Sequence, residues 1–254
     1  MSSHESQMHI WGHASKTDPS ATKESNTNGH RHTSISGYWM IQKATELWGP
    51  LGKGWGYEIL EDRIDIGGPI FRQQDEQEVK VADTQTHTIK LKLWYMLDGD
   101  KCELVQYGHT PYVYRTKYGA TTDAEAPKKS LTDALKKALS MLGFCADVYL
   151  GQFDDRNYVD AVRAEFDIAK ADDADEAMAE KIKEFTEWAV KELETYPLIP
   201  NKAALKAVLA GHLKRVYRQC PAIGMNSQAA AGRFQAAHDN ALSELEAKEV
   251  SNAS

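Results

Sequence analysis

The sequence predicts an α+β fold: a helix, an antiparallel β-meander and a second helix form a core, and a C-terminal helical region follows. Three observations predict it. Residues 87–97 alternate strictly between two kinds of side chain, as a strand with two different faces requires. Residues 128–142 repeat leucine at helical spacing. After Asp154 the chain shows four helical patterns separated by Asp, Pro and Gly.

The N-terminal segment differs from the rest. Residues 1–36 are rich in Ser, Thr, Asn, Gly and His and show almost no apolar periodicity, which predicts a disordered polar tail. It contains five histidines, namely His4, His9, His13, His30 and His32. Because a mobile tail offers no fixed geometry, solvated polar filler is the favoured interpretation and metal capture the alternative, so no metal site is assigned.

The first half of the core contains a helix and weaker strand signals. Residues 38–48 carry apolar side chains at helical spacing, and Gly49 and Pro50 end that helix. Short apolar alternations within residues 57–66 predict strand pieces, which the Gly-Gly-Pro sequence at 67–69 interrupts. Residues 70–86 are polar enough to form an elaborated loop or an edge strand.

A hairpin and the return strands complete the predicted sheet. Asp98 and Gly99 directly follow the clearest strand and are a strong turn signal. Residues 102–109 and 112–118 supply the return strands, which gives a meander of three to five strands. The predicted domains are therefore the tail at 1–36, the core at 37–158 and the helical region at 159–254.

Composition restricts the classes of function. The formal net charge of −7 means that any contact with nucleic acid must come from a local basic stripe. No run of about 18 apolar residues exists, so no membrane association is expected. The N-terminus lacks the apolar region of a secretory signal, and the three cysteines form no C-x-x-C motif. Both features fit the cytoplasm.

Two groups of lysines are candidate sites. The helix at 128–142 carries Lys128, Lys129, Lys136 and Lys137, and periodicity alone favours a solvated face. The strand at 87–97 interleaves Lys90 and Lys92 with Trp94, a composition typical of single-strand grooves, where amines meet phosphates and rings stack on bases. If the helix packs beside this hairpin, we expect the two polar faces to line one channel.

The sequence KKSLTDALKKALSMLG at 128–143 closely resembles the signature helix of the Rad fifty-two superfamily of single-strand annealing proteins. Upstream, IQKATELWG and GWGYEIL resemble the first helix and first strand of that family. The resemblance covers roughly residues 38–158 and indicates a divergent, phage-type (Erf/Sak-like) member. Two positions depart from eukaryotic members: Trp39 stands at a basic position and Pro50 at an aromatic one.

The resemblance implies a function and a set of site residues. Family members anneal complementary single strands as rings or other oligomers, without a nucleotide cofactor and without covalent chemistry. The two adjacent DNA-contacting basic residues of the family correspond to Lys136 and Lys137, and Lys128 matches a further basic position. Lys129, Lys90 and Lys92, with Trp94, are expected neighbours, whereas Asp133 is expected to be structural.

The resemblance also implies partners and a location. We expect single-stranded DNA, further copies of the chain in a ring or filament, and a single-strand binding protein or phage exonuclease, in the cytoplasm of a bacterial host. In the C-terminal region, basic residues lie on residues 202–219. They indicate a second DNA site, a partner-binding helix or, as the favoured interpretation, the solvated face of a bundle.

Two other classes of function remain as alternatives. Asp65, Glu78 and Lys80 resemble the D…E-x-K arrangement of Mg²⁺-dependent nucleases, in which carboxylates hold the metal, but the signal is weak. A phosphate loop is disfavoured, because Gly49 to Lys53 is too short for G-x-x-x-x-G-K and no Ser or Thr follows the lysine. The other alternative is a phage replication or recombination scaffold that does not bind DNA.

Overall fold

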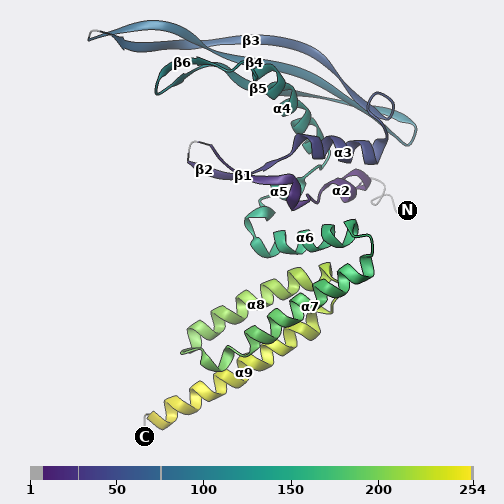
Figure 1. Cartoon of the computed structure of the whole chain (residues 1–254), viewed down its shortest axis with the longest axis vertical. Coiled ribbons are helices and arrows are strands. Elements are labelled where there is room, and N and C mark those ends of the chain that lie inside the picture. Colours follow the sequence, from purple (N-terminus) through teal and green to yellow (C-terminus); the bar gives the residue numbers. More distant parts are fainter. Residues whose placement is uncertain (1–7, 28, 75, 253–254) are drawn as a thin grey trace. The chain divides into compact units, whose positions relative to one another are not determined.

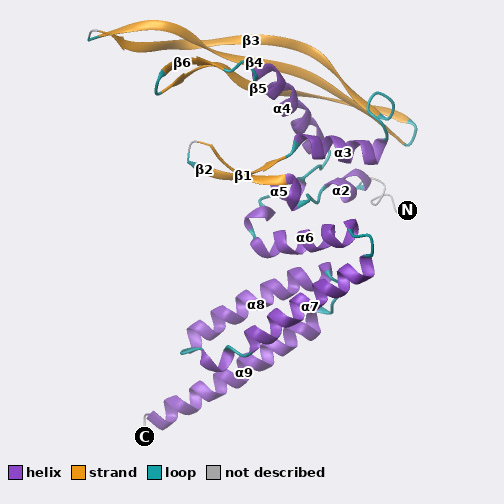
Figure 2. Cartoon of the chain, viewed as in Figure 1, coloured by secondary structure: helices purple, strands orange, loops and turns teal. Residues whose placement is uncertain are grey.

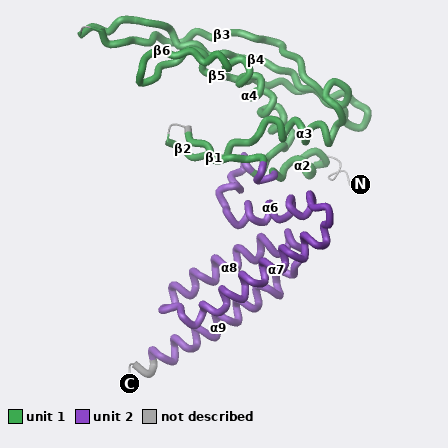
Figure 3. Tube along the Cα trace, in the orientation of Figure 1, with its two compact units in different colours: residues 1–17, 21–147 green, residues 18–20, 148–254 purple. Residues whose placement is uncertain are grey.

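The computed structural model describes residues 8–27, 29–74 and 76–252, and its mixture of helices and antiparallel strands confirms the α+β class (Figure 1). The chain divides into two compact units (Figure 3): residues up to Thr17 with Ala21–Asp147, and Asp18–Ser20 with the residues from Val148 onward. The division thus precedes the predicted boundary after residue 158. None of the helices in the described ranges combines the length and apolar composition that a membrane crossing requires.

Unit 1 contains a four-stranded antiparallel meander (Figure 2), within the predicted three to five strands. Its strands are β3 (Trp55–Gln74), β4 (Gln77–Leu97), β5 (Asp100–Thr116) and β6 (Gly119–Thr122), and each pairs with the next. Asp98 and Gly99 form the turn between β4 and β5, as predicted. Both have positive φ angles, 52° and 93°, which a type I′ turn requires.

Strands β3 and β4 form a much longer ribbon than predicted. Phe71 pairs with Lys80 and Gln74 with Gln77, so residues 70–74 and 77–86 are paired strand, which agrees with the edge-strand alternative and not with the loop. A register shift between Ile66 and Pro69 accommodates the glycines as a bulge. Side chains near the end of this ribbon are largely exposed on both faces. Hydrogen bonds between the two backbones, rather than burial of side chains, therefore hold this end of the ribbon together. This explains why the sequence shows no clear apolar alternation there.

Two helices, α3 (Gly37–Trp48) and α4 (Ala126–Met141), pack on one face of the sheet. Gly108 of β5 lies opposite Ile89 of β4, and a Cβ at Gly108 would lie 2.5 Å from the Ala134 nitrogen of α4. Ile89 is therefore on the helix-covered face, together with Leu91 and Leu93, which are fully buried. The lack of a side chain at Gly108 lets α4 approach the sheet closely.

The N-terminal residues that the structure describes are not a disordered tail. They form α2 (His9–Ala14), a 3₁₀ turn at Pro19–Ala21, and an antiparallel hairpin of β1 (Thr22–Thr27) and β2 (His30–Ile35). Asp147 is buried and accepts hydrogen bonds from the backbone nitrogen of Thr17 at 2.8 Å and from its hydroxyl. Such polar contacts with distant parts of the chain hold this segment in place. They cannot be predicted from apolar periodicity, which is why the sequence indicated disorder. Residues 1–7 lie outside the described part.

Unit 2 is a helical region, as predicted. After α5 (Ala146–Tyr149) and a 3₁₀ turn at Gln152–Asp154 come α6 (Arg156–Lys170), α7 (Ala174–Leu193), a 3₁₀ turn at Tyr196–Leu198, α8 (Lys202–Ala222) and α9 (Ser227–Asn252). Capping side chains start three of these helices: Asp155, Asp173 and Asn201 each accept a backbone N–H of the first turn. The core gathers around Phe185, Tyr196, Leu205, Val216 and Phe234.

Candidate nucleic-acid interface

The outward side of α4 carries the lysines that the sequence analysis selected. The apolar side of the helix fixes their direction, since Ala134, Leu135, Ala138 and Leu139 are buried. On the exposed side, a shallow pocket of about 250 Å³ is lined by Lys128, Lys129, Thr132, Asp133 and Lys136. The structure thus brings three of the four predicted helix lysines to one pocket. Lys137 is not part of its lining.

Three of the four helix lysines have an acidic partner. Lys128 lies 3.0 Å from Glu125, Lys129 lies 2.6 Å from Asp123, and Lys137 lies 2.8 Å from Asp133. The Asp123 contact raises the pKa of Lys129 above its ordinary value. These pairs are exposed, and ion pairs at a surface contribute little free energy and are screened by salt. An anionic ligand therefore competes with them at a small cost.

Lys136 differs from the other three. Its ammonium donates a hydrogen bond to the carbonyl oxygen of Ile35 at 2.9 Å, and it forms no ion pair within the described part of the chain. It is half-buried, and burial lowers its pKa from the ordinary value. An ammonium carries three N–H donors and a full charge, and the hydrogen bond of Lys136 goes to a neutral carbonyl, while the Asp133 carboxylate acts on its charge without forming an ion pair. Its ammonium is therefore available to an anion without breaking an ion pair.

Asp133 connects α4 to β5 and to the neighbouring Lys137. Its Oδ2 accepts the backbone N–H of His109 at 3.0 Å and the ammonium of Lys137 at 2.8 Å. The first contact joins α4 to β5 at a point where β6 does not extend, because β6 pairs only with Val113–Thr116. The Asp133 carboxylate thereby provides a hydrogen-bond acceptor for the backbone N–H of His109 at the edge of β5.

The expected single channel is not formed, because the sheet separates the two groups of lysines. Lys90 and Lys92 alternate with Ile89, Leu91 and Leu93, so they project from the face opposite to α4. The expectation was wrong because the alternation of β4 shows two faces without indicating which one the helix covers. The close approach at Gly108 decides that question.

The residues of the opposite face form a network of their own. Lys90 lies 2.9 Å from Glu61, and Lys92 lies 3.0 Å from Glu58. These contacts raise the pKa of both lysines. Trp94 lies across Gly56, where a Cβ would come within 2.8 Å of its ring, and the ammonium of Lys101 is 5.4 Å from the ring centroid. The three residues of the predicted strand face are thus engaged within the sheet.

Sequence reasoning missed a second group of interacting aromatic and polar side chains on this face of the sheet. The rings of Tyr107 and His109 stack with an interplanar angle of 3°, and Thr88 donates to Asp65 at 2.6 Å while contacting His109. Arg63 pairs with Asp65 at 2.8 Å. The tyrosine and histidine are two residues apart in a predicted strand, which places them on one face, but cross-strand register was needed to find their partners.

The structure does not assemble the nuclease alternative. Asp65 pairs with Thr86, whereas Glu78 pairs with Gln73, eight residues farther along β3. At about 3.3 Å per residue, this corresponds to roughly 25 Å along the ribbon. Lys80 forms an ion pair with Asp83. The E-x-K signal was misleading because it lies in an exposed ribbon far from Asp65.

The histidines of the N-terminal segment belong to separate elements. His9 and His13 lie on α2 with ring centroids 4.6 Å apart, His30 and His32 lie on β2, and His4 is outside the described residues. Across the residues that the structure describes, no group of three potential metal-binding side chains occurs.

Most basic residues of α8 have partners within unit 2. Lys202 pairs with Glu249 at 2.8 Å, Lys214 and Arg218 contact Asp155, and the Arg215 guanidinium lies 3.9 Å from the centroid of the Trp188 ring. These contacts favour the bundle interpretation of the helix.

Comparison with protein-family models gives no match for this sequence, and no curated protein matches it either.

Proposed function

We propose that the protein binds single-stranded DNA and anneals complementary strands during homologous recombination, as an oligomer and without ATP. Two features support the proposal. The order of elements over residues 38–158 is that of the family that the sequence resembles: helix, antiparallel meander and signature helix. The signature helix also carries a lysine-lined pocket on its exposed side.

The observation that carries the proposal is the Lys136 ammonium, which forms no ion pair among the described residues and lines one pocket with Lys128 and Lys129. A phosphate in the pocket would receive donors from Lys136 and compete with weak surface ion pairs at the other two lysines. Lysines make adaptable, salt-sensitive contacts with a phosphate backbone. Such contacts leave the base edges available to a complementary strand, which annealing requires.

Assembly of several copies would reconcile this local site with the acidic chain. One pocket supplies few contacts, but a row of identical pockets along one strand multiplies modest affinities. The meander leaves β3 and β6 as its edge strands in the described structure, and exposed apolar side chains such as Ile66, Phe71 and Val81 lie along the β3–β4 ribbon. Unpaired edges and exposed apolar side chains favour association into a ring or filament.

The proposed setting follows from the same resemblance. The protein would act in the cytoplasm of a bacterial host, with a single-strand binding protein or a phage exonuclease as its partner. Annealing breaks no covalent bond, so the proposal includes no catalytic residue, metal or cofactor.

A strand-annealing assay separates the three classes of function. Two complementary labelled oligonucleotides are mixed with the full chain, with and without Mg²⁺, and both duplex formation and strand length are followed. Faster pairing of intact strands without ATP supports annealing. Shortened strands in Mg²⁺ would indicate a nuclease, and the absence of any salt-sensitive binding would favour a scaffold.

A further inference from the structure

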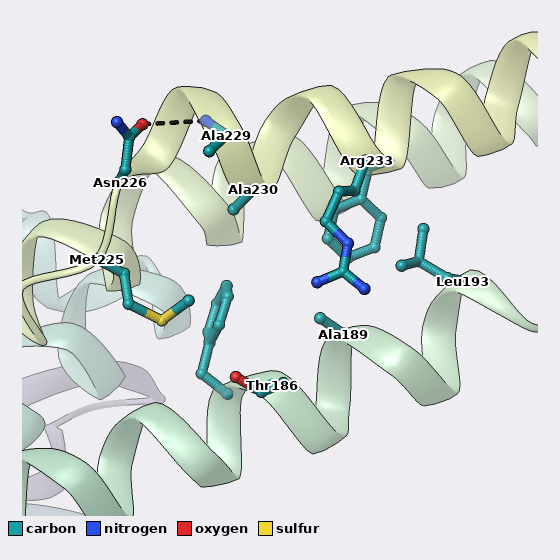
Figure 4. A pocket seen from close by; sticks show the side chains of 10 residues that line it. Thr186, Ala189, Leu193, Met225, Asn226, Ala229, Ala230 and Arg233 are labelled. Carbon is teal, nitrogen blue, oxygen red and sulfur yellow. Dashed lines mark hydrogen bonds between the residues drawn. The ribbon is translucent and has the colours of Figure 1, made fainter.

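Unit 2 contains a pocket between α7 and α9 that the proposed annealing activity does not use (Figure 4). Its volume is about 260 Å³, and its lining is predominantly apolar. Figure 4 shows Ala189 and Leu193 on α7 facing Ala230 and Arg233 on α9, with Met225 at one end.

The pocket exists because small residues face each other where larger ones would fill the space. Ala189 on α7 and both Ala229 and Ala230 near the start of α9 line the pocket. Phe185 and Phe234 line the pocket and are almost completely buried, with 4% and 1% of their surface exposed. The two buried rings make this part of the lining apolar and rigid.

Arg233 adds a charge to this apolar pocket. It is exposed, it reaches from α9 toward Ala189, and it has no ion-pair or hydrogen-bond partner among the described residues. None of the residues that line the pocket is acidic. Lys202 and Lys214 in the same unit are each paired with a carboxylate. The pocket thus combines an apolar lining with an unpaired guanidinium, which is suited to bidentate contact with a carboxylate.

We propose that this pocket binds a short acidic peptide segment of a partner protein: one large apolar side chain enters between α7 and α9, and a neighbouring carboxylate pairs with Arg233. The size fits, because a cavity of about 150 Å³ is sufficient for a benzene ring. Charge complementarity selects the peptide. A nucleic acid fits less well, because a phosphate backbone is bound by several cations and Arg233 is the only charged residue among those that line the pocket. This inference does not depend on the annealing function.

Fluorescence anisotropy with labelled peptides tests the proposal on the full chain. The probe is the peptide GSDFDS, and two relatives serve as comparisons: GSDADS lacks the apolar side chain and GSNFNS lacks the carboxylates. We expect GSDFDS to bind at least about tenfold more tightly than either relative, because each loses one of the two contacts.

Two variants locate the binding site. Arg233→Glu is expected to weaken GSDFDS binding by at least about tenfold and to leave GSNFNS binding nearly unchanged, because only the former has carboxylates to repel. Ala229→Leu places a side chain at the exposed mouth of the pocket and is expected to weaken both peptides. Lys206→Glu, which makes the same charge change on the exposed side of α8, is the matched control and is expected to bind like the unmodified chain.

Several results would overturn the proposal. Equal binding of the three peptides, an equal effect of Lys206→Glu and Arg233→Glu, or no binding of GSDFDS up to about 1 mM would each contradict it. Sedimentation of the variants tests whether another molecule occupies the pocket. If Ala229→Leu or Arg233→Glu reduces the oligomer size, a second copy of the chain occupies the pocket and the peptide proposal is wrong. The strand-annealing assay is independent of all these readouts.

Discussion

The ammonium of Lys136 lies 2.9 Å from the carbonyl oxygen of Ile35, and within the described chain no carboxylate forms an ion pair with it. The contact links the end of β2 to α4 across a hundred residues of sequence. It also gives Lys136 a surrounding unlike that of Lys137, which follows it directly but pairs with Asp133 at 2.8 Å. Two adjacent lysines that the sequence treats alike are therefore expected to contribute differently to DNA binding.

Replacing Lys136 is expected to weaken binding more than replacing Lys137. Lys136→Met keeps most of the aliphatic side chain but removes the charge, and we expect the Kd for a single-stranded oligonucleotide to rise by about tenfold. Lys137→Met is the matched control, with an expected change of less than about threefold because it breaks a surface ion pair. Fluorescence anisotropy measures both, and equal effects would contradict the special role of Lys136.

Binding is expected to be lost at alkaline pH because burial lowers the pKa of Lys136 from its ordinary value of 10.5. As pH rises through this lowered pKa, the folded protein loses a charge that the unfolded chain still carries. DNA affinity therefore falls. The free energy of unfolding rises over the same pH range, because the unfolded state binds more protons there than the folded state does. Lys136→Arg keeps its charge to higher pH and should shift the loss of affinity upward. An unchanged pH profile in this variant would exclude Lys136 as the titrating contact.

The two faces of the sheet are expected to differ in their salt response. For single strands, each phosphate contact contributes about 0.7 to the slope of log K against log salt. Lys128→Gln with Lys129→Gln should flatten this slope by about 1.4 if each lysine makes one contact. Lys90→Gln with Lys92→Gln is the matched double variant on the opposite face and should leave the slope unchanged. A larger effect of the second pair would place the DNA on the other side of the sheet.

The approach of α4 to the sheet is expected to depend on Gly108. A Cβ at this position would lie 2.5 Å from the Ala134 nitrogen, so Gly108→Ala should lower the free energy of unfolding by about 2 to 3 kcal/mol. Gly68→Ala is the control, because nothing lies within 4 Å of a Cβ there. Urea unfolding of both variants checks the difference. Similar midpoints would mean that the helix packs on the sheet less closely than the structure indicates.

Much of the fold could be predicted from local signals. A periodicity or a turn residue that is independent of distant contacts marks the Asp98–Gly99 turn, α3, α4 and the four long C-terminal helices. For the end of the β3–β4 ribbon at residues 70–74 and 77–86, local signals left a loop and an edge strand open, and they did not indicate the β1–β2 hairpin. Their strands pair through the backbone and bury few side chains, so their composition resembles that of loops.

The candidate site was predicted by residue but not by geometry. The helix lysines were identified, yet the sequence did not show that Lys136 contacts Ile35 or that Lys137 lies outside the pocket. It also placed Lys90 and Lys92 beside the helix lysines. Which face of a strand a helix covers is determined by tertiary packing, here by the absence of a side chain at Gly108.

Strand annealing by the full chain is the measurement that tests the central claim most directly. Complementary oligonucleotides are mixed without ATP or Mg²⁺ in the presence of the unmodified chain or of a variant that combines Lys128→Gln, Lys129→Gln and Lys136→Met. The proposal predicts that the unmodified chain accelerates duplex formation and that the folded variant, verified by circular dichroism, does not. Equal annealing by both proteins would contradict the assignment of the α4 pocket, and no acceleration by the unmodified chain would contradict the proposed function.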